Sequence, residues 1–217
     1  MSQTKDIREA VEAELTFDPR MDQTNITVRN MNGEVALSGT VPSFPQYLGA
    51  AAAARRVAGV KNVHNHLKVV LPPGDYRDDA MLTTMANDVL ALNITVPDGV
   101  EATARNGDLR LTGTVSYGSQ ASAAELAVAG LTGVRSIQDE IKVAYGADPV
   151  DVTRAVQDAL DRYALFPDDS DVVVDTSANT VTLTGHVATW TEHDAAVRAA
   201  QMASGVVEVF DDLNITG

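Results

Sequence analysis

The stretch Gly33-Glu34-Val35-Ala36-Leu37-Ser38-Gly39-Thr40-Val41 decides the fold, because it occurs three times in this chain of 217 residues. The second copy is Gly107-Asp108-Leu109-Arg110-Leu111-Thr112-Gly113-Thr114-Val115, and the third is Asn179-Thr180-Val181-Thr182-Leu183-Thr184-Gly185-His186-Val187. The copies are offset by 74 and then 72 residues. Apolar residues alternate with polar ones in each copy, which predicts a strand with one face in a core.

A second signature repeats with the same offsets. It reads Gly59-Val60-Lys61-Asn62-Val63, then Gly133-Val134-Arg135-Ser136-Ile137, then Gly205-Val206-Val207-Glu208-Val209. Two sequence motifs that recur with the same offsets indicate tandem homologous units. We place these units at residues 1–73, 74–146 and 147–217.

Turn and cap residues mark the boundaries of the elements in each unit. The pairs Asn32-Gly33 and Asn106-Gly107 suit the positive φ of a type I′ hairpin, and Ala178-Asn179 is a weaker signal at the same place. Ser43 with Gln46, and Thr189 with Glu192, fit capping boxes at the start of an alanine-rich helix. Asp148 and Pro149 are the expected N-cap and first residue of a helix in the third unit.

The elements therefore follow the order α-β-β-α-β in each unit. The second and third strands are joined through a helix, so we expect them to be parallel with a right-handed crossover. The predicted fold class is α+β, with three tandem units, each a three-stranded mixed sheet with two helices packed on one face. Aromatic residues make up only 5% of the chain, so Ala, Val, Leu and Ile must form the cores.

The signature strand, the alanine-rich helix and the Gly-Val-x-x-Val or Gly-Val-x-x-Ile entry to the last strand resemble the BON domain. That family is named for bacterial osmotically induced and nodulation-associated proteins. The resemblance covers nearly the whole chain, three times. It implies an αββαβ fold and a non-enzymatic role in binding phospholipid or envelope surfaces during osmotic or general stress. It also makes a monovalent cation, potassium above all, an alternative ligand.

The sequence carries no recognisable catalytic chemistry. It has no Gly-x-Ser-x-Gly, phosphate-binding loop, dinucleotide fingerprint or His-Glu-x-x-His motif, so we expect no enzyme and no cofactor. The absence of cysteine excludes disulfides and thiolate-bound metals. A net charge of −14 argues against nucleic acid as a partner, because nucleic acids are bound by cationic surfaces.

The repeated glycines are interpreted as structural. Three of these glycines lie in the middle of a predicted strand, namely Gly39, Gly113 and Gly185. A missing side chain there allows a neighbouring element to approach closely, and we expect that element to be the alanine-rich helix. The C′ position at the end of that helix favours a residue with a left-handed backbone conformation. The candidates for this position are Gly59, Gly133 and Gly205.

Histidines and acidic clusters were considered as ligands. His64 and His66 share one side of a predicted strand and could bind a metal ion. Their counterparts are Gln138 with Glu140 and Phe210 with Asp212, which do not preserve a ligand set, so an exposed polar face is favoured. His186 and His193 are expected to be isolated on the surface. The cluster Asp168-Asp169-Ser170-Asp171 lacks the remaining residues of a calcium loop, and we interpret it as a solvated turn.

Charge differs strongly between the units. Basic residues exceed acidic ones by one in the first unit and fall short by five and ten in the second and third. No acidic residue occurs from Val35 to Gly74, where the basic side chains are Arg55, Arg56, Lys61 and Lys68. This basic surface could bind anionic lipid head groups, a protein partner or the acidic third unit of another copy, and the alternative is that it is simply solvated.

Apolar residues near the start of the second helix are a further candidate contact. Phe44, Tyr47 and Leu48 are expected to be exposed, and Trp190 occupies the position of Phe44 in the third unit. Such side chains can enter a membrane interface, but contact between units is the favoured interpretation.

Two hypotheses follow from these observations. The first is a BON-type module that binds phospholipid surfaces, and the second is a cytoplasmic ion-binding protein or protein-interaction scaffold. No signal peptide is visible in the sequence, so we expect a cytoplasmic location, or a periplasmic one if a leader has been removed.

Overall fold

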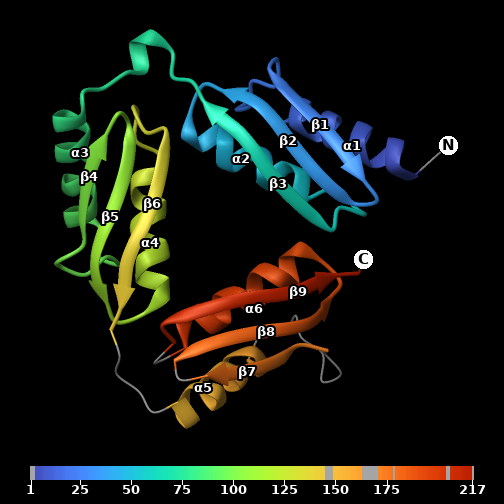
Figure 1. Ribbon diagram of the computed structural model, residues 1–217, viewed down its shortest axis with the longest axis vertical. Coiled ribbons are helices and arrows are strands. Elements are labelled where there is room, and N and C mark those ends of the chain that lie inside the picture. Colours follow the sequence, from blue (N-terminus) through green and yellow to red (C-terminus); the bar gives the residue numbers. More distant parts are fainter. Residues whose placement is uncertain (1–2, 145–148, 163–170, 178, 204–205, 217) are drawn as a thin grey trace. The chain divides into compact units, whose positions relative to one another are not determined.

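The computed structural model describes residues 3–144, 149–162, 171–177, 179–203 and 206–216. It contains three separate three-stranded sheets, each accompanied by two α-helices (Figure 1). The predicted α+β class with three αββαβ units is therefore confirmed. The expected N-cap Asp148, the turn residue Ala178, Gly205 and the acidic residues 168–169 lie outside the described residues.

The first repeat shows how each sheet is assembled. Its elements are α1 (Gln3–Phe17), β1 (Ile26–Met31), β2 (Glu34–Val41), α2 (Phe44–Arg55) and β3 (Asn62–Val69). Strand β2 is central, antiparallel to β1 and parallel to β3. Both helices lie on one face of the sheet, which leaves the other face free of helices (Figure 1).

The other two repeats have the same order of elements. The middle one contains a 3₁₀ helix, η1 (Pro73–Asp75), followed by α3 (Asp79–Leu92), β4 (Glu101–Arg105), β5 (Asp108–Val115), α4 (Gly118–Ala129) and β6 (Ser136–Val143). The third contains α5 (Pro149–Asp161), β7 (Val173–Ser177), β8 (Thr180–Val187), α6 (Trp190–Met202) and β9 (Glu208–Ile215). Strand β8 is antiparallel to β7 and parallel to β9.

The alternation of the signature strand places its apolar residues in the cores. Val35 and Leu37 are fully buried, and so are the corresponding residues Leu109, Leu111, Val181 and Leu183. Alanines of the second helix pack on this face; the fully buried ones include Ala50, Ala53, Ala124 and Ala196. Each core is therefore built from small and branched aliphatic side chains, as the composition requires.

The mid-strand glycines have a different structural role from the one predicted. Gly39, Gly113 and Gly185 have positive φ angles of 122°, 143° and 115°. A Cβ at Gly39 would overlap the carbonyl oxygen of Asn25, just before β1, and not the alanine-rich helix. The same carbonyl accepts a hydrogen bond from the Thr40 N–H at 3.2 Å. The missing side chain thus lets the start of the neighbouring strand close over the signature strand.

The second glycine position was also predicted only in part. Gly59 and Gly133 have positive φ angles of 84° and 104°, as expected. However, α2 ends at Arg55, and Gly59 lies in a separate turn in which the Val60 N–H donates to the Val57 carbonyl at 3.2 Å. Glycine is required by this turn and not by the helix end itself.

Both helices begin directly after the predicted N-cap residues Ser43 and Thr189, but only the capping box at Thr189 is formed. Glu192 N–H donates to Thr189 Oγ1 at 3.2 Å, and Glu192 Oε2 accepts from the Ala188 N–H at 2.8 Å. Ser43 makes no such side-chain bond, because Gln46 Oε1 accepts instead from the Asp22 N–H at 2.8 Å. The two hairpins turn as predicted, with φ of 57° at Asn32 and 54° at Asn106.

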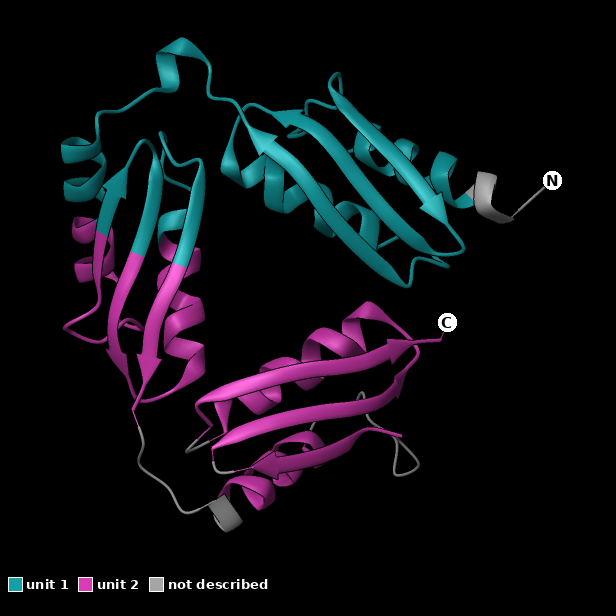
Figure 2. Ribbon diagram, viewed as in Figure 1, with its two compact units in different colours: residues 1–86, 103–110, 128–138 teal, residues 87–102, 111–127, 139–217 magenta. Residues whose placement is uncertain are grey.

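The chain forms two compact units (Figure 2). The first comprises residues 1–86, 103–110 and 128–138, and the second comprises 87–102, 111–127 and 139–217. The boundary between the units passes through the middle repeat. The first repeat therefore belongs wholly to one unit and the third repeat wholly to the other.

Candidate interaction surface

The helix-free side of the first sheet carries a group of exposed side chains, which we call the first open face. Successive residues of a strand point to opposite sides of the sheet. The residues that alternate with the buried core residues therefore point away from the helices. The exposed members of this face are Thr27, Arg29, Met31, Glu34, His64, His66 and Lys68. Val70 continues the outward series beyond β3 and is 58% exposed.

The strand register brings basic side chains of both edge strands onto this face. Arg29 of β1 pairs with Ala36 of β2, and Ala36 pairs with His64 of β3. The central strand contributes only small residues between them, namely Ala36, Ser38 and Thr40. Among the described residues, no carboxylate forms an ion pair with Arg29 or Lys68. These two cations are therefore available to an external anion.

The two histidines of this face lie together, as the sequence predicts. The rings of His64 and His66 are nearly parallel, with 6.3 Å between their centroids. His64 Nε2 lies 3.0 Å from Glu34 Oε2, and about half of each of these two side chains is exposed. Glu34 is the only acidic residue on the first open face.

The four basic residues singled out in the sequence do not form one patch. Arg55 and Arg56 lie at the C-terminal end of α2, and the Lys61 N–H donates to the Gly33 carbonyl at the hairpin end of the sheet. Lys68 lies seven residues further along β3, a distance of about 23 Å. Arg56 is already engaged, since its Nε lies 2.8 Å from Glu14 Oε1. Only Lys68 of these four belongs to the first open face.

The predicted exposure of Phe44 is wrong. Phe44 is 5% exposed and stacks on Tyr47 with ring centroids 5.6 Å apart, so it belongs to the core of the first repeat. Tyr47 is half-buried, whereas Leu48 is 38% exposed. Trp190 is also half-buried, and its ring centroid lies 4.8 Å from that of His193. Most of these aromatic side chains therefore stabilise their own repeats.

The helix-free side of the third sheet forms an equivalent surface, the third open face. Threonines line its central strand at Thr180, Thr182 and Thr184. Its exposed edge-strand side chains include three acids and two apolar residues, namely Val173, Asp175, Glu208, Phe210 and Asp212. Within the described part of the chain, no cation pairs with Asp175, Glu208 or Asp212.

Histidines of the third repeat are not isolated, contrary to the sequence-based expectation. Only 12% of the His193 side chain is exposed, with Nε2 2.7 Å from Asp211 Oδ2 and Nδ1 3.3 Å from Asp194 Oδ1. Burial by itself lowers the pKa of His193, but hydrogen bonds to Asp211 and Asp194 and their negative charges outweigh it, so the net shift is upward. His186 is exposed and lies 2.6 Å from Asp171.

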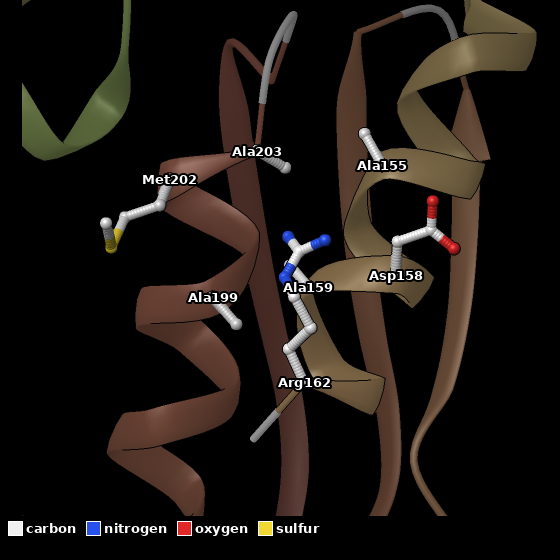
Figure 3. Close-up of a pocket in the computed structure, with 7 residues that line it drawn as sticks. All are labelled: Ala155, Asp158, Ala159, Arg162, Ala199, Met202 and Ala203. Atoms are coloured by element: carbon white, nitrogen blue, oxygen red, sulfur yellow. The ribbon is translucent and has the colours of Figure 1, made fainter.

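A groove lies between α5 and α6 of the third repeat (Figure 3). It has a volume of about 460 Å³ and is lined by Ala155, Asp158, Ala159, Arg162, Ala199, Met202 and Ala203. The Arg162 side chain extends between the two helices, whereas Met202 is directed outward. Alanine makes up most of the lining, so the groove offers few groups that could select a ligand.

A second depression, of about 470 Å³, lies over strands of the middle repeat. It is lined by Thr103, Arg105, Asn106, Asp108, Arg110 and Gln138. Two guanidinium groups and one carboxylate face this space, so its charge is mixed. On the first open face, by contrast, two cations outnumber one acid, and the exposed charges named on the third open face are all acidic.

Metal and membrane-spanning sites were also considered. Among the side chains that the structure describes, no three His, Cys, Asp or Glu residues come together as ligands for a metal ion. No helix in the described ranges combines the length and the apolar character needed to cross a bilayer.

Several residues of the open faces were missed by sequence reasoning. Arg29, Met31 and Asp175 belong to no charge run and to no helix start, so those patterns do not point to them. The signal that could have found them is strand alternation, applied to the first strand of each repeat as it was to the second. Register then places those residues beside the outward residues of β3 and β9.

Comparisons with known proteins agree with the repeat structure. A model of the BON domain family matches residues 3–70, 78–145 and 148–217. Osmotically-inducible protein Y from Escherichia coli K12 is 29% identical over 137 residues, which cover 61% of this chain and 68% of that protein.

Two solved structures are also similar, at low scores. The C-terminal domain of CdsD, a structural protein of the Chlamydia trachomatis type III secretion system, is 16% identical, with all of both chains covered and a TM-score of 0.27. The periplasmic domain of the S. typhimurium inner-membrane protein PrgH is 11% identical, with 94% of this chain and 100% of that chain covered and a TM-score of 0.24.

Proposed function

Because the chain belongs to the BON domain family, with three copies of that domain, we propose that it is a non-catalytic protein that binds anionic phospholipid surfaces in an osmotic or general stress response. The similarity to osmotically-inducible protein Y supports the link to osmotic stress. The first open face is the binding surface in this proposal.

One observation carries the proposal. Arg29 and Lys68 project from the same helix-free face without carboxylate partners among the described residues, and exposed apolar side chains accompany them. Met31 is 76% exposed at one end of the face, and Val70 is 58% exposed at the other. Basic side chains near an anionic leaflet contribute about 1 kcal/mol each, and apolar side chains add to the binding when they enter the interface.

The other two repeats have the wrong charge for this role. The middle and third repeats, residues 74–146 and 147–217, carry net charges of −5 and −10 in the sequence, so an anionic surface repels them. The protein should therefore approach such a surface with its first repeat. Binding should weaken as salt is added, because the Debye length falls from about 30 Å at 0.01 M to about 3 Å at 1 M.

Co-sedimentation of the full chain with vesicles tests the proposal. We expect the protein to pellet with vesicles that contain phosphatidylglycerol, and to stay in solution with pure phosphatidylcholine vesicles or at high salt. Equal recovery with both kinds of vesicle, or no recovery with either at low ionic strength, would rule out an electrostatic lipid-binding function.

A further inference from the structure

We propose that the first open face of one copy of this chain docks on the third open face of another copy. This inference goes beyond lipid binding and depends on the charges of the two faces, not on the proposed function. The two surfaces are built on the same fold, so their outlines correspond strand by strand. They differ in the charged side chains of their edge strands, which include Arg29 and Lys68 on the first face and three acids on the third.

Arg29 on β1 corresponds to Asp175 on β7, so the charge at this position is opposite on the two faces. His66 on β3 corresponds to the carboxylate of Asp212 on β9, and each pair is offset by 146 residues. Lys68 adds to the positive side, and Glu208 adds to the negative side. Two such faces attract one another, whereas two third open faces repel.

None of these charges is neutralised within its own repeat. In the described residues, Arg29 and Lys68 have no carboxylate partner, and Asp175, Glu208 and Asp212 have no cationic partner. Charges of this kind are exposed and solvated in the single chain. Docking would pair them across an interface and steer the approach of the two copies.

Apolar side chains on both faces favour the same contact. Phe210 is 51% exposed and Val173 is 56% exposed on the third open face, while Met31 is 76% exposed on the first. Two sheets pack face to face about 10 Å apart, and exposed side chains of this size would fill that space. A purely solvated polar face would not need these residues.

The contact is heterologous, because it joins unlike surfaces. A copy that uses its first open face still presents its third open face, so each copy can bind two others. Such association produces open chains, or closed rings where the geometry allows. The same first open face is proposed to bind lipid, so assembly and lipid binding should compete.

Charge reversal in the full-length protein provides the test. The variant Arg29→Glu/Lys68→Glu makes both open faces acidic, and the variant Asp175→Lys/Asp212→Lys makes both basic. All four side chains are exposed on strands, so neither variant removes a core contact. Arg154→Glu/Arg198→Glu is the control for the first variant, because it lowers the net charge by the same amount at exposed positions on the helices α5 and α6.

Sedimentation velocity at low ionic strength measures the outcome. We expect the unmodified chain and the control to form larger species that dissociate at high salt, and each reversed variant alone to remain monomeric. An equimolar mixture of the two reversed variants should associate again, which contact within one chain could not produce. A monomeric unmodified chain, or a mixture that stays monomeric, would overturn the proposal.

Vesicle binding separates this proposal from the lipid-binding function. The unmodified chain carries both faces as they are and should pellet with anionic vesicles. If the unmodified chain binds vesicles but the mixture does not associate, docking fails while lipid binding stands. If the mixture associates but no form of the chain binds vesicles, lipid binding fails while docking stands.

Discussion

His193 of α6 is hydrogen-bonded to Asp211 of β9, with Nε2 2.7 Å from Oδ2, beneath the ring of Trp190. The corresponding pair in the first repeat is Tyr47 and Asn65, where Asn65 Nδ2 donates to the Tyr47 carbonyl at 2.8 Å. Both repeats thus connect the start of the second helix to the middle of the last strand. The third repeat makes this connection with a titratable pair.

The His193–Asp211 pair predicts how stability depends on pH. The pKa of His193 is raised in the folded state, so its protonated form favours folding. This stabilisation is complete below the unfolded value of about 6.5 and is lost as the pH rises through the folded value. Urea unfolding of the third repeat, measured from acidic to alkaline pH, should show a decrease in the free energy of unfolding. His193→Gln and Asp211→Asn should both abolish this decrease. An unchanged pH profile in both variants would contradict this assignment.

Replacement of Gly39 by alanine should destabilise the first repeat strongly. The positive φ and the overlap with the Asn25 carbonyl both oppose a side chain at Gly39, and strain of this kind costs about 1–3 kcal/mol. Gly74→Ala is the matched control, since no atom lies within 4 Å of a Cβ there, and it should change stability by less than about 0.5 kcal/mol. Thermal unfolding of the two variants gives the comparison, and equal melting temperatures would be inconsistent with it.

The two helix caps should differ in their contribution to stability. Thr189→Ala removes a bond to the Glu192 N–H and should cost about 1 kcal/mol. Ser43→Ala removes no capping bond, so its cost should be smaller. Chemical denaturation gives the free energy of unfolding of both variants. A larger decrease for Ser43→Ala than for Thr189→Ala would refute the assignment of the capping bond to Thr189 alone of these two residues.

Substitutions of Phe44 and Met31 should distinguish a loss of stability from a loss of surface binding. Phe44→Ala empties a buried site in the first repeat and should cost about 3–5 kcal/mol. Met31→Ala alters an exposed side chain, so stability should hardly change while recovery with anionic vesicles falls. Unfolding and co-sedimentation, measured on both variants, test this division. A Met31→Ala variant with full vesicle binding would exclude that side chain from the interface.

Repetition made the fold accessible to sequence reasoning. The alternation from Val35 to Val41 and the pair Asn32-Gly33 each specify local structure, and three copies with one spacing remove accidental matches. Local rules were sufficient there because the deciding interactions lie close together in the sequence. The same holds for the cap at Thr189, which bonds to a residue three positions away.

Interactions across the fold were harder to predict. The carbonyl that faces Gly39 belongs to Asn25, and the partner of His193 is Asp211 in the next strand. Phe44 is buried because its helix begins over the sheet, which its position in the sequence alone did not indicate. The basic surface expected from the sequence differs from the first open face because strand register also could not be predicted. Register brings Arg29 and Lys68 to one face and leaves Lys61 at the hairpin end.

The most direct test of the account compares the affinities of two charge variants for anionic vesicles. Arg29→Gln/Lys68→Gln removes the two unpaired cations of the first open face and should weaken binding about 30-fold, from about 1 kcal/mol for each residue. Arg154→Gln/Arg198→Gln changes net charge equally on α5 and α6 and should have a much smaller effect. Equal affinities for the two variants would contradict a lipid-binding role for the first open face.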